Sequence, residues 1–208
     1  MNYNINMDAI NELILSFENL RMLEDEIRTS ANLITESFSN GNKLLLCGNG
    51  GSCADCEHIA GEMVKQFAKE RPLNPEIVEK LGPELSSELH GGLPALSLPS
   101  MIGFHTAFNN DNNPEFAFAQ QVVAFGKAND VLWGISTSGN SKNVLHAVKT
   151  AKALGLKTIG LTGENGGELS QIADITIKAP AGNVARIQEL HLPIYHAICA
   201  FVEDKLFP

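Results

Sequence analysis

The residues best suited to chemistry lie in one short stretch, where a glycine-rich turn is followed by a histidine and a glutamate. Residues 44–52 read LLLCGNGGS, which predicts a buried strand, a tight turn and the start of a helix. Backbone N–H groups of such a turn and the positive end of the helix favour a bound anion. His58 and Glu62 are four residues apart, so their side chains leave the same helix face. Together these features predict an enzyme that acts on a phosphorylated small molecule.

A second loop rich in hydroxyl groups follows another apolar run. Residues 131–135 are apolar, and residues 136–141 read STSGNS, which can offer a phosphate both side-chain and backbone donors. Serine, threonine and asparagine are also favoured as helix caps, which is the alternative interpretation. Two such loops, each after a predicted parallel strand, would meet at the carboxyl edge of a sheet, where open α/β folds bind ligands. This rule favours an anion-binding role for both loops.

Other polar residues have simpler interpretations when only local spacing is considered. The loop 161–167 has the composition of an ordinary strand-to-helix turn. Asp111, in the polar run 109–113, is interpreted as a helix cap. His191 is interpreted as a satisfied core residue of the last helix, and spacing alone gives His196 no stronger role.

Short apolar runs alternate with amphipathic segments along the chain, which indicates a parallel sheet covered by helices on both faces. The first and last helices are long and carry more apolar surface than one sheet face covers, so we expect an oligomer built through them. The predicted strands are 43–47, 94–98, 131–135, 157–161 and 175–177, and the predicted helices are 7–38, 114–126, 140–154 and 184–206.

Residues 69–92 break this pattern. They include Pro72, Pro75, Pro83 and a Gly-Gly pair, and predict an irregular excursion with about one helical turn on the side where the glycine loop opens. Two interpretations stay open: a lid or subunit contact, and a surface loop without a function.

Length and composition limit the remaining possibilities. The 208 residues fit one domain, and 44% of them are hydrophobic, as in ordinary globular proteins. The net charge of −9 argues against direct binding of nucleic acid. No run approaches a membrane span and residues 1–7 lack a signal pattern, so we expect a cytoplasmic protein without membrane partners. Cys53 and Cys56 form a lone C-x-x-C and are interpreted as packing residues.

Five separated motifs resemble, in order, those of the phosphoheptose isomerase family, whose members carry a sugar-isomerase (SIS) domain and act on sedoheptulose 7-phosphate. The motifs are GNGGS at 48–52, His58 with Glu62, GISTSGNS at 134–141, LTG at 161–163, and RIQELH at 186–191 with His196.

The resemblance implies a fold, an assembly and a reaction. We expect a single SIS domain over 1–208 with a doubly wound, mostly parallel five-stranded sheet, and a homotetramer with active sites between subunits. Residues 1–40 would make oligomer contacts. The implied reaction converts sedoheptulose 7-phosphate to D-glycero-D-manno-heptose 7-phosphate through an enediol.

The resemblance also implies roles for individual residues. Glu62 would be the catalytic base and His196 its acid/base partner, which suits the proton chemistry of a carboxylate and an imidazole. One zinc ion per active site would be held by His58, Glu62, Gln188 and His196 and would polarise the carbonyl. The implied substrate contacts are Asn49, Gly50, Gly51, Ser52, Asn110, Asp111, Ser136, Thr137, Ser138, Ser141 and Gln188.

Three features depart from the family pattern. Ala185 stands where many members carry an acidic residue, Gln66 replaces a frequent basic residue, and the segment 69–92 is longer than usual. Another sugar phosphate is therefore an alternative substrate. A further alternative is a related non-catalytic tetrameric adaptor of the replication initiator protein, which shares the RIQE motif and the C-terminal LFP. A sugar-phosphate sensor without turnover is a third alternative.

Overall fold

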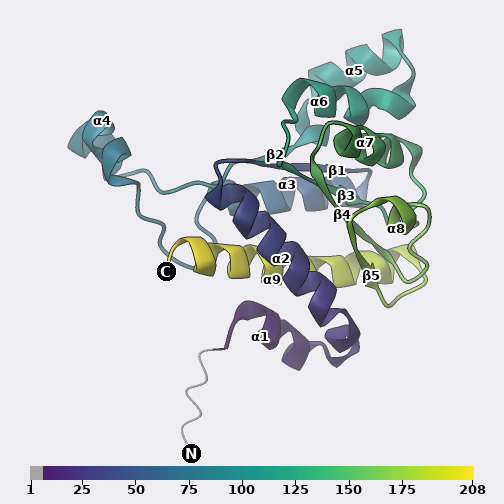
Figure 1. Cartoon of the computed structure of the whole chain (residues 1–208), viewed down its shortest axis with the longest axis horizontal. Coiled ribbons are helices and arrows are strands. Elements are labelled where there is room, and N and C mark those ends of the chain that lie inside the picture. Colours follow the sequence, from purple (N-terminus) through teal and green to yellow (C-terminus); the bar gives the residue numbers. More distant parts are fainter. Residues whose placement is uncertain (1–6) are drawn as a thin grey trace, which may run out of the picture.

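The computed structural model describes residues 7–208, and its centre is one sheet of five parallel strands (Figure 1). The order across the sheet is β2-β1-β3-β4-β5, and every neighbouring pair is parallel. The predicted five-stranded parallel sheet is therefore confirmed, with strand ends shifted by a few residues. The strands are β1 (Leu44–Gly48), β2 (Ala95–Ser97), β3 (Val131–Ile135), β4 (Lys157–Gly163) and β5 (Ile175–Ala179).

Helices bury both faces of the sheet, because apolar side chains point alternately to each side of a strand. Leu44 and Leu46 belong to the core shared with α2 (Glu24–Ser39), α3 (Gly51–Val64) and α9 (Val184–Leu206). Leu45 and Cys47 belong to the core on the other face. That face is covered by α6 (Ala117–Phe125), α7 (Lys142–Ala153) and α8 (Leu169–Ile172).

The part of the sheet that matters for a ligand is where β1 and β3 lie next to each other. From β1 the chain passes through α3 to β2 on one side, and later returns to pair β3 with the other side of β1. The strand order reverses there, so the loops after β1 and β3 leave the same edge side by side. Open α/β sheets bind ligands at such a switch point.

The predicted single helix over 7–38 is wrong, because the chain breaks at Phe17. It forms α1 (Ala9–Ser16), a 3-10 helix η1 (Glu18–Leu23) and then α2. Phe17 has φ −130° and ψ 78°, which no helix accommodates. The apolar stripe continues through the break, since a 3-10 helix also repeats every three residues. The spacing of apolar residues in the sequence therefore could not reveal the break at Phe17.

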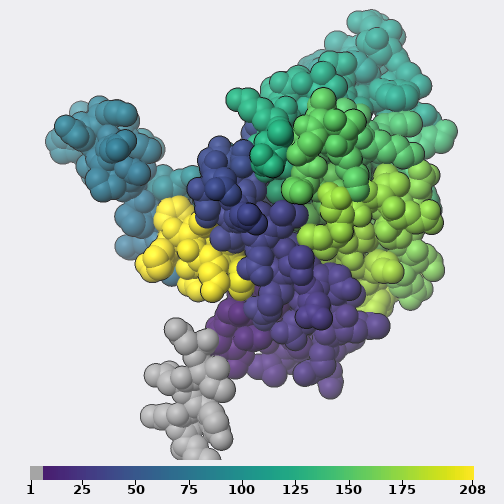
Figure 2. Space-filling model, viewed as in Figure 1, coloured from purple at the N-terminus to yellow at the C-terminus, as the bar shows by residue number. Residues whose placement is uncertain are grey.

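The segment 69–92 is an excursion as predicted, but it has more helix than the single turn expected. Residues Pro75–Ser86 form α4, which is interrupted at Gly82 (φ 73°) before Pro83. Figures 1 and 2 show α4 standing away from the body of the molecule. None of its residues is buried, and Ile77, Val78 and Leu85 are exposed.

Another short helix was not predicted from the sequence. Residues Ile102–Asp111 form α5, which is followed by the 3-10 helix η3 (Pro114–Phe116); a further 3-10 helix, η2, spans Leu98–Ser100. Asp111 ends α5 and caps nothing, whereas the side chain of Asn113 accepts a hydrogen bond from Glu115 N. The interpretation of Asp111 as a helix cap is therefore wrong.

The cysteines are free thiols, as their interpretation as packing residues requires. Cys47, Cys56 and Cys199 are buried, and Cys53 is half-buried. Burial raises the pKa of the Cys47 thiol to about 12. Among residues 7–208, no helix combines the length and apolar character needed to cross a membrane.

Two glycines with left-handed backbones provide a test of the loop after β3. Gly41 (φ 75°) has no neighbour near the position of a Cβ, whereas a Cβ on Gly139 (φ 67°) would clash with the Gly166 carbonyl. We expect Gly41→Ala to lower the free energy of unfolding by about 1–2 kcal/mol from backbone strain alone. Gly139→Ala should cost about 1–3 kcal/mol more, because the clash adds to the same strain. Urea unfolding measures both values; equal losses would contradict this packing.

Candidate active site

The glycine-rich loop after β1 needs small residues because other groups approach its backbone. A Cβ on Gly48 would lie 2.7 Å from the Ser52 carbonyl oxygen, so the turn into α3 closes only with glycine there. Gly50 has φ 57°, again a glycine conformation. A Cβ on Gly51 would overlap the side-chain amide of Gln188, so Gln188 on α9 lies directly over this loop. The fold thus joins two predicted site residues that are far apart in the sequence.

The loops after β1 and β3 are joined by a pair of asparagines. Asn49 Nδ2 donates to Asn143 Oδ1 at 2.9 Å, and Asn143 Nδ2 donates back to Asn49 Oδ1 at 2.8 Å. Within the second loop, Ser136 Oγ donates to Ser141 Oγ at 3.0 Å. The sequence analysis did not identify Asn143; its place in the first turn of the helix after STSGNS was the available signal.

Two hollows, each of about 290 Å³, open beside these loops. One is lined by Gly48, Asn49 and Gly50 together with residues of α5 and α6. The other is lined by Thr137 and Ser138 together with Gly163 and Ile187. The predicted loop residues therefore border open space of the size that a phosphorylated small molecule needs.

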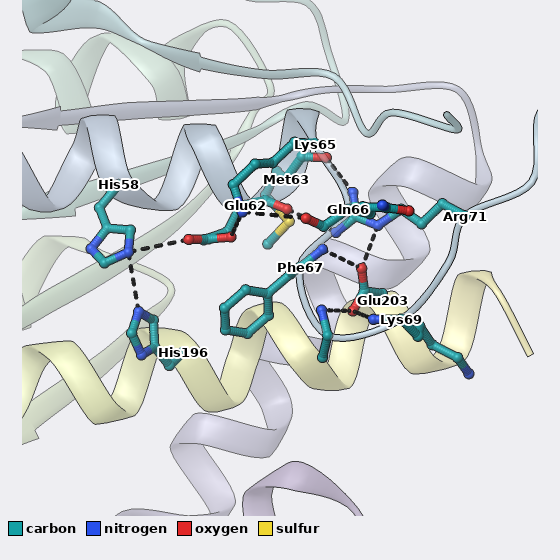
Figure 3. A network of polar contacts seen from close by, with 11 residues as sticks. His58, Glu62, Met63, Lys65, Gln66, Phe67, Lys69, Arg71, His196 and Glu203 are labelled. Carbon is teal, nitrogen blue, oxygen red and sulfur yellow. Dashed lines mark hydrogen bonds and ion pairs between the residues drawn. The ribbon is translucent and has the colours of Figure 1, made fainter. Parts of the chain in front are cut away.

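His58, Glu62 and His196 form a polar cluster between α3 and α9 (Figure 3). His58 Nε2 lies 3.2 Å from Glu62 Oε1 and 3.3 Å from His196 Nε2. Glu62 is 8% exposed, so its carboxylate is largely shielded from water yet lies against the His58 imidazole. Burial, followed by the proximity of His58, lowers the pKa of His196, while the charge of Glu62 opposes this shift. The cluster unites a carboxylate and a neutral imidazole, which are the groups required to move protons.

Lys65 is a further member of this cluster that sequence analysis did not identify. Its Nζ lies 2.6 Å from Glu62 Oε2, on the opposite side of the carboxylate from His58. The i, i+3 spacing of Glu62 and Lys65 on a predicted helix was the signal that could have revealed the pair.

Tyr195 contacts His58 on the Nδ1 side of its ring, away from Glu62, and Asp55 contacts Tyr195. The Tyr195 hydroxyl lies 3.0 Å from His58 Nδ1 and donates to Asp55 Oδ1 at 3.4 Å. Burial raises the pKa of Asp55 to about 6, and the Tyr195 hydrogen bond partly opposes this rise. Because Nδ1 is engaged here, Nε2 of His58 is the nitrogen directed at Glu62 and His196.

His191 is buried as predicted, but it is only half satisfied, because Nδ1 has no hydrogen-bond partner among residues 7–208. It is fully buried, and its Nε2 lies 3.2 Å from the Thr162 carbonyl oxygen. Burial lowers the pKa of His191 to about 4, so the ring is neutral at neutral pH.

Asn110 and Asp111 lie apart from the cluster. Both are exposed at the end of α5, where Asn110 Nδ2 donates to Asp111 Oδ1 at 2.8 Å. None of the hydrogen bonds or ion pairs found in residues 7–208 joins either residue to His58, Glu62 or His196. One chain thus connects the two loops and places Gln188 over the first of them, whereas Asn110 and Asp111 have no such contact.

The predicted zinc ligands fit the ion in donor chemistry. Imidazole nitrogen and carboxylate oxygen are ordinary zinc donors, and two nitrogens bound to one tetrahedral zinc lie about 3.3 Å apart. The His58–His196 separation of 3.3 Å agrees with that spacing. Within residues 7–208, however, no three His, Cys, Asp or Glu side chains are already gathered about one point. Gln188 lies over Gly51 rather than in the contacts of the cluster.

Comparisons with known proteins identify the family of the chain. The family model described as "SIS domain" matches residues 7–91 and 90–163. The chain is 41% identical over 198 residues to the phosphoheptose isomerase of Aneurinibacillus thermoaerophilus, covering 95% of this chain and 89% of that protein. It is also 41% identical to phosphoheptose isomerase 2 of Campylobacter jejuni, covering 95% and 88%.

Solved structures show the same relationship. The phosphoheptose isomerase GmhA of Neisseria gonorrhoeae superimposes with a TM-score of 0.76 at 34% identity, covering 93% of this chain and 94% of that one. A phosphoheptose isomerase from Francisella tularensis gives a TM-score of 0.76 at 31% identity, covering 95% and 100%. Sequence motifs, fold and relatives agree, and the chain therefore belongs to the SIS domain family, among the phosphoheptose isomerases.

Proposed function

We propose that this chain is an aldose–ketose isomerase that converts sedoheptulose 7-phosphate to D-glycero-D-manno-heptose 7-phosphate. The observation that carries the proposal is the shielded Glu62 carboxylate between His58 and Lys65, on the helix that begins at the glycine-rich loop. The relatives named phosphoheptose isomerase at about 40% identity support the choice of substrate.

The two loops would hold the phosphate end of the sugar. Ser52 is the second residue of α3, whose N-terminal N–H groups and dipole favour an anion. The hydroxyls after β3 add donors that no apolar loop offers: Ser136, Thr137, Ser138 and Ser141. Fixing the phosphate positions the other end of the substrate with respect to Glu62, which reduces the entropic cost of the reaction.

Glu62 would carry the proton between the two reacting carbons. It takes a proton from carbon 1 of the ketose to give an enediol, and returns a proton to carbon 2. The oxygen of carbon 2 gains a proton as the enediol forms, and carbon 1 becomes the aldehyde when its hydroxyl proton leaves as carbon 2 is protonated. The neutral imidazole of His196, which contacts the same His58 nitrogen as Glu62, suits these transfers between oxygens.

Zinc is part of this proposal, with His58, Glu62, Gln188 and His196 as its ligands. When bound, the ion would polarise the substrate carbonyl and offset negative charge on its oxygen. The hydrogen bond between Tyr195 and His58 Nδ1 would orient His58 for such a role, as partners behind metal-binding histidines do.

A homotetramer is also proposed, as is a cytoplasmic location. Large apolar side chains stay exposed on the single chain: Leu15 (65%) and Met22 (75%) near the N-terminus, and Ile102 (74%) on α5. A partner that covers α5 could bring Asn110 and Asp111 into an active site, which one chain alone does not do. The adaptor alternative gains no support from the site, since Glu62 and His196 both contact His58 as an enzyme would need.

The role of Glu62 is tested by removing its charge. We expect Glu62→Gln to lower kcat for sedoheptulose 7-phosphate by about 100-fold or more, because the amide cannot accept the proton. Folding and binding of inorganic phosphate should stay largely unchanged. The control is Glu57→Gln on the same helix. Glu57 is exposed, and its side chain accepts a hydrogen bond from the Ser100 hydroxyl. Aldose formation is followed directly, and full activity of Glu62→Gln would refute the mechanism.

The proposed zinc site is tested by metal content as well as by activity. We expect about one zinc per chain in protein loaded with zinc and then dialysed. His58→Ala should lose this zinc, because it removes a ligand. His146→Ala, which alters a histidine on α7 near Glu115, should keep it. A chelator should lower the isomerase activity and added zinc should restore it. Equal zinc content in His58→Ala and the unaltered protein would count against the site.

The oligomer is tested at its apolar N-terminal surface. We expect light scattering to give the mass of a tetramer for the unaltered protein. The double variant Leu15→Glu and Met22→Glu should shift it to smaller species, since buried charges without partners oppose association. Leu154→Glu, at an exposed position (42%) after α7, is the control and should not change the mass. A monomer of the unaltered protein would refute the proposed tetramer.

A further inference from the structure

Arg71 and Glu203 form a fully buried ion pair next to the active-site cluster. Both side chains have no exposed area, and Arg71 Nε donates to Glu203 Oε1 at 2.6 Å (Figure 3). The other two nitrogens of the guanidinium also donate: Nη1 to the Met63 carbonyl at 2.5 Å and Nη2 to the Glu62 carbonyl at 2.8 Å. Arg71 therefore holds the backbone of Glu62 itself.

Glu203 in turn holds the segment that follows α3. Its two carboxylate oxygens accept hydrogen bonds from the backbone N–H groups of Phe67 (2.8 Å), Ala68 (2.7 Å) and Lys69 (3.1 Å). The Phe67 ring lies 5.4 Å from the ring of His196. One carboxylate on α9 thus fixes the loop that passes beside the second proposed catalytic residue.

These contacts act where α3 ends. The last carbonyls of a helix have no partner within it, and a cation near this end is favourable. Arg71 satisfies two of these carbonyls, including the carbonyl of Glu62. The last turn of α3 and Lys65 are therefore fixed with respect to α9, which carries His196.

The pair is poorly explained as a source of stability. Removing two charges from water costs about as much as their attraction returns, so apolar residues of the same volume often stabilise a fold equally well. A planar guanidinium that donates in three directions instead specifies one geometry of the groups around it.

We infer that the Arg71–Glu203 pair is a positioning device for the base: it holds the end of α3 so that the Glu62 carboxylate stays between His58 and Lys65. The inference rests on the proposed function, because it takes Glu62 as the base. Neither Arg71 nor Glu203 touches substrate; both act through the backbone of Glu62 and of residues 67–69.

A matched ion pair joins the residues just before β1 and β3. Asp130, just before β3, is 1% exposed and pairs with Lys43 Nζ at 2.6 Å. It also accepts hydrogen bonds from the backbone N–H groups of Lys43 (3.0 Å) and Lys127 (2.8 Å). Among residues 7–208, its hydrogen bonds and ion pairs reach none of His58, Glu62 and His196, so Asp130→Asn removes a similar buried carboxylate without touching the cluster.

The test compares Glu203→Gln with Asp130→Asn. We expect both variants to lose thermal stability, but only Glu203→Gln should lower kcat, by about tenfold or more, because a displaced base reacts poorly. Its KM and its affinity for inorganic phosphate should change less than about twofold, since the anion loops are untouched. Unchanged kcat in folded Glu203→Gln, or an equal loss in Asp130→Asn, would overturn the inference.

A second variant and a second measurement complete the test. If Glu203→Gln does not fold, Arg71→Lys takes its place, since it keeps the charge but cannot donate in three directions at once. Amide hydrogen exchange over residues 62–69 is measured in every variant. If the unaltered protein shows no isomerase activity, the proposed function fails; the positioning role then depends on exchange, and equal protection of 62–69 in Glu203→Gln and Asp130→Asn overturns it.

Discussion

The parallel sheet with its reversal of strand order at β1 is the constraint on which the candidate site depends. Parallel strands place all their carboxyl ends at one edge, and the reversal leaves the loops after β1 and β3 side by side. The reciprocal hydrogen bonds of Asn49 and Asn143 then hold these loops together. Without that edge, the glycine-rich loop and the serine-rich loop would each be an ordinary turn.

The polar cluster lies along the helix that leaves this edge, and it is held by the contact between α3 and α9. Glu62 and His58 come from α3, His196 and Tyr195 come from α9, and the Arg71–Glu203 pair joins the two elements near the end of α3. Apolar residues of both helices pack in the same core. The groups that would move protons are therefore fixed by packing on one side and by buried hydrogen bonds on the other.

The excursion 69–92 is connected to the site through the same arginine. The Gly91 N–H donates to the Arg71 carbonyl at 2.8 Å, so both stems of the excursion meet at Arg71. The Arg71 guanidinium also lies 5.4 Å from the ring of Phe207. The excursion 69–92, whose helix α4 stands away from the body, is thus attached at Arg71, the residue that holds the backbone of Glu62.

The sequence by itself determined the strands, the two loops and the face shared by His58 and Glu62. These depend on local rules: apolar runs, glycine and hydroxyl chemistry, and the i, i+4 spacing of a helix. The glycine-rich loop and the sheet were therefore predictable, and the motif order also indicated the family. The break at Phe17 was not predictable, because 3-10 and α-helical periodicities are too similar.

Only the tertiary structure decided which distant residues meet. Arg71 and Glu203 are 132 residues apart, and nothing in their local sequence marks either as buried. His196 looked like any core or interface histidine of a helix until α9 was packed against α3. Asn110 and Asp111 remain apart from the cluster in a single chain. The physical reason is that local patterns specify how each element forms, whereas burial and charge pairing depend on which elements come together.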